Sequence, residues 1–300
     1  MSAAAVSAQD MAAATETYNN GATSLSMGQN ATALDYFKSA LEMASACGDE
    51  GTDIVNNCKD IIPKIVLAVA KDNIQASEFD KAVTQLNEAI KVAGEYGNAD
   101  VAAEAKDLIP QVFMQKANNA LNKKDFAGAI EGYKQAVAID STNGMASLRL
   151  GMAFAALGKA EDAEKAFGMA MRNGQQSSAV KQLSNMYVKL AAASLKTKNY
   201  EKAISDALKS FEYLENPTAM KVAGTAAAQL KKNKEAIEYL ESYTALSPKA
   251  RDLNNMFYTI AVLAQTEGDN AKACGYYKKI AADPKYGEAA KQQIAALKCE

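Results

Sequence analysis

Small and bulky apolar residues recur along the chain at a spacing that predicts pairs of packed helices. In the clearest unit, Ala163 follows Gly151 by twelve positions, and Phe167 follows four positions later. A small residue and an alanine twelve positions on recur seven times: Gly21 and Ala33, Ala70 and Ala82, Ala117 and Ala129, Gly151 and Ala163, Ala191 and Ala203, Gly224 and Ala236, Ala261 and Ala273. The residues four positions further are Phe37, Leu86, Tyr133, Phe167, Ala207, Leu240 and Tyr277, so only Ala207 is not bulky. Helices approach closely where both lack bulk, and a large neighbour on the same face fills the adjacent groove. Seven helix pairs are predicted.

This pattern resembles the tetratricopeptide repeat family, in which the first helix carries a Gly or Ala and the second an Ala-aromatic-Ala face. The resemblance covers residues 13–283 and implies an all-α fold, a right-handed α-α superhelix of seven helix pairs. Pro217, Pro248 and Pro284 stand near expected helix boundaries, where proline is tolerated because it cannot continue a preceding helix. Residues 284–300 are predicted to hold a polar-faced capping helix, as repeat arrays need at their ends.

Two repeats are longer than the others. Successive second-helix alanines are 49, 47, 34, 40, 33 and 37 residues apart, against about 34 in the family. The two long gaps contain the related segments Lys59–Pro63 and Lys106–Pro110, each with its proline 19 residues before the next alanine. We expect helix hairpins that project past the repeats within residues 10–283, with proline kinks in the first helices of repeats two and three. Unstructured loops are the alternative.

Composition and charge narrow the function. The chain is 49% hydrophobic with 17 Gly and 5 Pro, enough to bury a large core, and contains no run of about 20 apolar residues that would span a membrane. Residues 1–118 hold 8 Lys against 16 acidic residues, whereas residues 119–300 hold 25 basic against 19 acidic residues. The lysines are interleaved with acids and do not form a concentrated basic stripe with aromatic residues for base stacking, so we expect no nucleic-acid partner. The opposite charges leave self-association open.

The four cysteines fall into two local pairs, and each pair flanks one predicted interhelical turn. We predict the disulfides Cys47–Cys58 and Cys274–Cys299, which would place the chain in an oxidising compartment. Four reduced thiols in a cytoplasmic protein are the alternative. Residues 1–9 read as the tail of a secretory signal peptide or as a disordered start, with Val6 and Ala8 as the small residues before a cut. The start also resembles that of secreted Bacteroidetes proteins. Together these features favour a periplasmic or secreted protein.

Catalytic chemistry is not expected. The chain contains no His, which removes the usual general base and the commonest metal ligand. The cysteine gaps do not match zinc knuckles, so we predict no metal and no cofactor. The segment Gly151–Lys159 lacks the spacing and the following Ser or Thr of a phosphate loop. Acid pairs such as Asp49 with Asp53 and Glu161 with Glu164 are typical of solvated helix faces. We therefore predict a protein that is not an enzyme.

The family resemblance places candidate binding residues on the first helices, which line the concave groove in that family. The inward positions lie three before, one after and five after each small residue. In repeats three to seven they are Met114, Asn118, Asn122, Leu148, Met152, Ala156, Val188, Ala192, Lys196, Lys221, Thr225, Gln229, Tyr258, Val262 and Thr266. Arg149 and Lys189 flank this floor. The predicted partner-binding set is Asn118, Asn122, Arg149, Met152, Lys189, Lys196, Lys221, Gln229 and Tyr258; interhelix packing and solvation are the alternative roles.

The resemblance thus implies a scaffold that binds a peptide or protein partner. Some family members grip a peptide C-terminus with Lys, Asn and Arg, but Met114 stands where the first Lys would be, so no carboxylate clamp is predicted. The alternative is an accessory protein that binds a glycan or small molecule through Tyr18 and Tyr258. Low aromatic content and the absence of Trp weigh against it.

Overall fold

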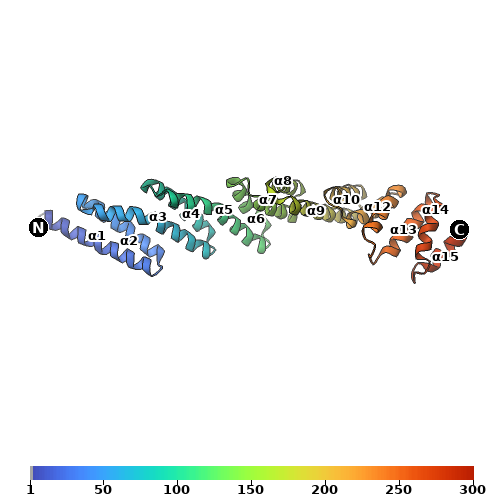
Figure 1. The fold of residues 1–300 in the computed structure, drawn as a ribbon, viewed down its shortest axis with the longest axis horizontal. Helices are drawn as coiled ribbons and strands as arrows, with labels where there is room; N and C mark the ends of the chain where they lie inside the picture. Colours follow the sequence, from blue (N-terminus) through green and yellow to red (C-terminus); the bar gives the residue numbers. More distant parts are fainter. Residues whose placement is uncertain (1–2) are drawn as a thin grey trace. The chain divides into compact units, whose positions relative to one another are not determined.

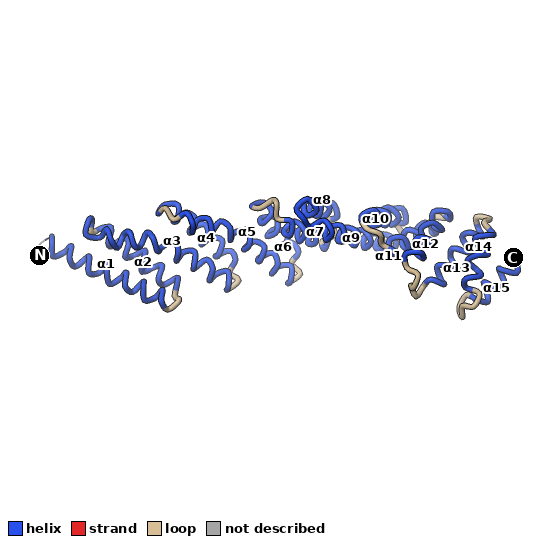
Figure 2. Tube along the Cα trace, viewed as in Figure 1, coloured by secondary structure: helices blue, strands red, loops and turns tan. Residues whose placement is uncertain are grey.

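The structure, a computed structural model, describes residues 3–300, with side chains described from Asp10 onward. These residues form α-helices joined by short connections, without a strand (Figures 1 and 2). Two compact units divide the chain, Met1–Leu157 and Gly158–Glu300, called here the N-terminal and C-terminal units. The predicted all-α fold of seven helix pairs and a capping helix is confirmed.

The N-terminal unit contains three helix pairs and the first helix of the fourth, and each helix packs against the next one along the chain. Its helices are α1 (Ala3–Ser26), α2 (Asn30–Ala46), the short 3-10 helix η1 (Gly48–Gly51), α3 (Thr52–Gln75), α4 (Phe79–Tyr96), α5 (Ala99–Asn122), α6 (Phe126–Ile139) and α7 (Gly144–Ala156). The odd-numbered helices of this unit are first helices of a pair.

The C-terminal unit begins with the second helix of the fourth pair and continues through pairs five to seven. Its helices are α8 (Ala160–Ala170), α9 (Gln176–Lys196), α10 (Tyr200–Tyr213), α11 (Pro217–Gln229), α12 (Asn233–Leu246), α13 (Leu253–Thr266), α14 (Asn270–Ile280) and α15 (Gly287–Ala296). The segment η2 (Met171–Gln175) between α8 and α9 is a turn, because Asn173 and Gly174 have non-helical backbone angles. Consecutive helices pack together, and the first helices α9 and α11 also contact each other. The predicted cap corresponds to α15.

Helix starts follow from short polar side chains. Asn98, Asp125, Asn143, Asn199, Asn216 and Asp269 each accept a hydrogen bond from a backbone N–H in the first turn of the next helix. Such caps satisfy donors that the helix itself leaves unpaired. Several turns inside a pair contain one residue with φ near +60° to +80°, for example Gly28, Lys124 and Gly268. The chain therefore reverses within three or four residues, and the two helices of a pair lie antiparallel.

The predicted packing positions form the core of both units. All fourteen small residues and alanines are buried. Their followers are buried too, with Phe37, Leu86, Tyr133, Phe167 and Ala207 at 0% exposure and Leu240 and Tyr277 at 1%. The small residues thus allow the backbones of neighbouring helices to approach closely. The space that remains beside each close contact is filled by one larger residue in most pairs.

Gly224 provides a direct test of this close approach, because a Cβ atom built on it would lie 2.6 Å from Leu240 Cγ and 3.2 Å from the Ala236 carbonyl oxygen. We expect Gly224→Ala to lower the free energy of unfolding by about 2 kcal/mol, since the buried leucine has no free space into which to move. Urea denaturation followed by circular dichroism measures the change.

The matched control is Gly275→Ala in α14, where nothing lies within 4 Å of the added methyl group. Because alanine favours helix more than glycine does, this variant should gain about 0.5 to 1 kcal/mol. Equal behaviour of the two variants would contradict the proposed contact.

The extra residues of the two long repeats lie in helices and not in unstructured loops: α3 and α5 each contain 24 residues, whereas α7 contains 13. Pro63 and Pro110 both lie inside these helices. The helices that precede them are also long, since α2 has 17 residues and α4 has 18, whereas α6 has 14. The long gaps are therefore filled by added helical turns on both sides of the connection between one pair and the next.

Residues 3–9, for which a disordered start was one of two predictions, belong to helix α1, which begins at Ala3. Residues 1 and 2 of the predicted signal remnant lie outside the described residues. The signal-peptide interpretation stays a prediction, since an Ala-rich remnant is compatible with a helix.

The two predicted disulfides have different outcomes. Cys274 and Cys299 are paired, with their Cα atoms 5.5 Å apart, within the range that disulfides span. Cys47 and Cys58 are free thiols, so the structure does not form the second predicted bridge. The η1 helix separates them: the Cys47 thiol donates to the Met43 carbonyl oxygen at the end of α2, whereas Cys58 is fully buried in the core of the N-terminal unit. Burial raises the pKa of the Cys58 thiol to about 11.

Candidate partner-binding surface

A pocket forms in the N-terminal unit where a long first helix meets a short one. Counted from the packing residues Ala117 and Gly151, α5 begins 18 residues earlier and α7 begins 7 residues earlier. The difference of 11 residues extends α5 beyond the start of α7 by about 16 Å. The pocket at this step, called here the step pocket, is lined by Lys106, Asp107, Pro110, Gln111, Met114, Gln115, Ile139, Asp140 and Asn143.

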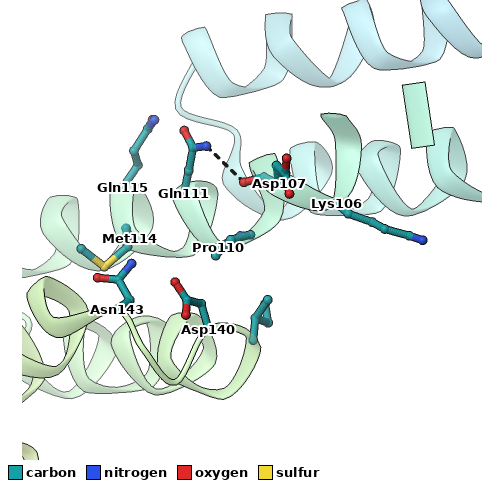
Figure 3. Close-up of a pocket in the computed structure, with 9 residues that line it drawn as sticks. Lys106, Asp107, Pro110, Gln111, Met114, Gln115, Asp140 and Asn143 are labelled. Atoms are coloured by element: carbon teal, nitrogen blue, oxygen red, sulfur yellow. Dashed lines mark hydrogen bonds between the residues drawn. The ribbon is translucent and has the colours of Figure 1, made fainter. Parts of the chain in front are cut away.

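The step pocket combines apolar, amide and charged side chains (Figure 3). Met114 and Pro110 project from α5 toward Asp140 and Asn143 on the connection between α6 and α7. Ile139, at the end of α6, is 51% exposed. An exposed apolar floor next to amides can accept both the side chains and the backbone of a peptide.

Local hydrogen bonds hold part of this pocket in place. Gln111 Nε2 donates to the Asp107 carbonyl oxygen at 3.1 Å, one turn back on α5 (Figure 3). Asn143 Oδ1 accepts from the Ala146 backbone N–H at 2.9 Å and thereby caps α7. Asp140 Oδ1 accepts from the Thr142 hydroxyl at 2.6 Å. The connecting loop is therefore ordered by its own polar groups, and the Asn143 amide nitrogen and Gln115 remain for a partner.

Asn118 and Arg149, two predicted binding residues, are brought together beside this pocket. Asn118 Oδ1 accepts from the Tyr133 hydroxyl at 2.7 Å and from Arg149 Nη1 at 3.1 Å. Burial raises the pKa of Tyr133, and Arg149 opposes that rise, so the phenol stays a donor. The three residues join α5, α6 and α7. Asn118 and Arg149 therefore order the wall of the surface as much as they present polar atoms to a partner.

The other predicted residues of the N-terminal unit lie near helix ends or on exposed faces. Asn122 is exposed at the end of α5, and Met152 is 37% exposed on α7. No contact joins them to Asn118 or Arg149 among the described hydrogen bonds. They belong to the first-helix surface and not to the step pocket.

The predicted residues of the C-terminal unit divide into free and engaged side chains. Lys189, Lys196 and Gln229 are exposed. Lys221 is engaged: its Nζ lies 2.5 Å from Asp252 Oδ2 and 5.6 Å from the centre of the Tyr243 ring. Hydrogen bonds from Lys221 and Tyr243 lower the pKa of Asp252. Lys221 therefore joins α11 to the start of α13.

Tyr258 is also engaged within the protein. Its ring stacks on Tyr286 with the centroids 5.1 Å apart and meets Tyr277 edge-on at 6.1 Å. The Tyr286 hydroxyl donates to Asn255 Oδ1 at 2.8 Å. This aromatic cluster holds the first turns of α13 against the segment before α15, and Tyr286 covers one face of the Tyr258 ring.

A polar network on α8 and α10 was not predicted from the sequence. Lys209 Nζ lies 2.8 Å from Glu164 Oε1 and donates to the Tyr187 hydroxyl at 2.7 Å. The Tyr213 hydroxyl donates to Glu164 at 2.7 Å. Burial and the bond to Glu164 raise the pKa of Tyr213 to about 12. Burial alone would raise the pKa of Glu164, but the bonds from Lys209 and the tyrosines lower it.

This network joins residues up to 49 positions apart in the sequence, and no short sequence motif indicates it. Glu164 Oε1 accepts from Tyr213 and pairs with Lys209, and the lowered pKa of Glu164 favours its ionised form. These bonds join α8 to α10.

The described residues contain no group of three or more His, Cys, Asp or Glu side chains placed to bind a metal ion. No described helix is long and apolar enough to cross a membrane.

Comparisons with known proteins agree with the paired helices. Two family models, both described as tetratricopeptide repeat, match residues 120–187 and 188–251. No curated protein sequence matches the chain. Among solved structures, MamA is 19% identical with a TM-score of 0.38, covering 63% of this chain and 96% of MamA.

Two further solved structures match the chain. YrrB, described as a TPR protein with an unusual peptide-binding site, is 19% identical with a TM-score of 0.36, covering 65% of this chain and 97% of YrrB. A thermophilic TPR protein from Thermus thermophilus is 16% identical with a TM-score of 0.28, covering 63% of this chain and 98% of that protein. Residues 120–251 therefore match the tetratricopeptide repeat, within a chain of paired helices.

Proposed function

We propose that this protein is a non-catalytic scaffold that holds a peptide or a segment of a protein partner against its first helices. The observation that carries the proposal is the step pocket, where Met114, Pro110 and the exposed Ile139 lie beside the amides of Gln111 and Asn143. A pocket of this kind suits an apolar anchor side chain flanked by a hydrogen-bonded backbone.

Methionine supports such a role because its flexible thioether adapts to different apolar surfaces. Met114 is half-buried on α5, so a partner would cover it without a large rearrangement of the helix. Asn118 and Arg149, fixed by Tyr133, form an ordered wall next to it. Because these side chains are already ordered, binding a partner costs less conformational entropy.

The glycan-binding alternative gains no support from the aromatic residues. Tyr258 is covered by Tyr286, and Tyr18 packs edge-on against Phe37 with the centroids 5.1 Å apart. Sugar stacking needs a free aromatic face. We therefore place the partner among proteins and peptides.

The envelope location is part of the same proposal. It is supported by the pairing of Cys274 with Cys299, since disulfides persist in oxidising compartments, and by the Ala-rich start of the chain. Fractionation of native cells, with the N-terminal sequence of the mature chain, tests the location.

Partner binding is tested by placing a photo-crosslinking residue at Met114 in the full chain. We expect a discrete crosslinked protein from native extracts, and a synthetic peptide covering the crosslinked segment should bind with micromolar affinity. Met114→Asp should weaken that binding at least tenfold, about 1.4 kcal/mol, because a charge would be buried against an apolar anchor.

Met43 on the second helix α2 gives the control, because it is an accessible methionine, 42% exposed, that does not line the step pocket. Crosslinker at Met43 should recover no discrete partner, and Met43→Asp should leave peptide binding unchanged. Equal crosslinking at both positions would reject the step pocket as the site.

A further inference from the structure

The first helices of the C-terminal unit contain no acidic residue. The helices α9, α11 and α13 together hold four lysines and no Asp or Glu, whereas the second helices α8, α10 and α12 each hold three acids. The remaining second helix, α14, holds three lysines and no acid. The charged side chains within the first helices of this unit are therefore all positive.

Three of these lysines lie on one face of α9. Lys181, Lys189 and Lys196 are all exposed and are 8 and 7 residues apart. At 100° and 1.5 Å per residue they occupy a sector of about 80°, with steps of about 12 and 10 Å along the helix. We call this face, with the exposed Asn185 and Ala192 between the lysines, the lysine stripe.

The charges of the stripe are not neutralised by ion pairs, in contrast to five other lysines of the unit. Lys202, Lys209, Lys221, Lys232 and Lys272 each form an ion pair with a carboxylate. Within the residues that the structure describes, none of the three stripe lysines does so, because the acids of this unit stand on second helices and at helix ends. The unit as a whole holds 21 basic and 16 acidic residues, so the field at the stripe is not cancelled by its surroundings.

We infer that the lysine stripe binds an acidic segment of a partner protein, with carboxylates spaced about 10 to 12 Å apart along α9. Such spacing arises on a helix with acids seven or eight residues apart. The exposed Ala192 and Asn185 leave a shallow, small-residue path between the charges, which allows a partner helix to approach closely. The inference deepens the proposed scaffold function and rests on it, since it assigns the chemistry of a segment that the scaffold holds.

Complementary charge acts mainly through association rate and selection of the partner. Three exposed ion pairs add modest affinity, and salt screens them. The binding should therefore weaken as sodium chloride rises from 50 to 500 mM, whereas an apolar contact would strengthen or stay constant.

The test uses the full chain and a labelled helical peptide of about 18 residues with three Glu at spacings of eight and seven, in an Ala- and Gln-rich background. Fluorescence anisotropy should show that it binds at least tenfold more tightly than the same peptide with Gln in place of Glu. The variant Lys181→Gln, Lys189→Gln, Lys196→Gln should lose at least tenfold in affinity.

The control variant Lys234→Gln, Lys249→Gln, Lys291→Gln removes the same charge from other exposed positions of this unit and should stay within twofold. Equal affinity for the Glu and Gln peptides, or equal loss in both variants, would overturn the inference. Stripe-dependent binding of a single-stranded oligonucleotide or of anionic vesicles, without binding of the peptide, would overturn it as well.

These results are distinguishable from a failure of the scaffold proposal. Crosslinking at Met114 reports on the step pocket of the N-terminal unit, while the peptide assay reports on α9. Partner capture at Met114 with no preference for the Glu peptide would retain the scaffold and reject the acidic partner segment.

Discussion

Replacing Phe37 by alanine is expected to lower the free energy of unfolding of the N-terminal unit by about 3 to 5 kcal/mol. Phe37 is fully buried on α2, and its ring fills the space that Gly21 leaves on α1, where an added Cβ would lie 3.1 Å from the ring. Tyr18 meets the same ring edge-on. Alanine would leave a cavity that neighbouring helices, already in backbone contact, cannot close.

Chemical denaturation of the full chain measures this loss. The neighbouring Tyr36, 37% exposed, gives the control, since Tyr36→Ala should change stability by less than about 1 kcal/mol. Gly21→Ala and Phe37→Leu should each destabilise, and the double variant should lose less than the sum because the smaller side chain at position 37 accepts the methyl group. Strict additivity would show that the small and bulky residues do not pack as a pair.

Loss of the Cys274–Cys299 bridge should destabilise the C-terminal end by about 3 kcal/mol, the range for a loop of this length. The bridge joins α14 to a residue that follows α15, so the capping helix would otherwise depend on few contacts. The variant Cys274→Ser, Cys299→Ser should show early urea unfolding of the last repeat, visible as a separate transition because repeats unfold partly independently.

Thiol counting supplies the control for this prediction. Without reductant, one thiol, Cys47, should react in the native state at pH 8, and a second, Cys58, only after unfolding, because burial raises its pKa to about 11. Four reactive thiols in protein prepared from its native compartment would contradict the bridge. Cys47→Ser should leave stability unchanged.

The repeated core could be predicted because its contacts are local in sequence. Within each unit the two helices of a pair pack against each other across a tight turn, so a pattern that repeats at twelve positions predicts the buried residues directly. Even Ala207, the exception, fits the structure: it is fully buried, and nearby the Ser184 and Ser210 hydroxyls lie 3.0 Å apart between α9 and α10. A hydrogen bond between small side chains takes the place of a bulky residue.

The candidate site was predictable only in part. The register placed Asn118, Lys189 and Lys196 on first helices, but the partners of Lys221 and Arg149 lie 31 residues away in each case. Contacts at that distance depend on how successive repeats stack, which no local spacing encodes. The step pocket depends on where α7 begins relative to α5. The sequence indicates that repeat three contains extra residues, but it does not indicate that these residues extend α5 beyond the start of α7.

Hydrogen–deuterium exchange of the full chain, with and without the crosslinked partner, tests the central claim most directly. The account predicts that binding slows exchange in the first helices, at residues 106–115 of α5 and 181–196 of α9, and leaves the second helices α4 and α10 unchanged. Slowed exchange confined to the second helices, or none in either first helix, would contradict a scaffold that holds its partner on this surface.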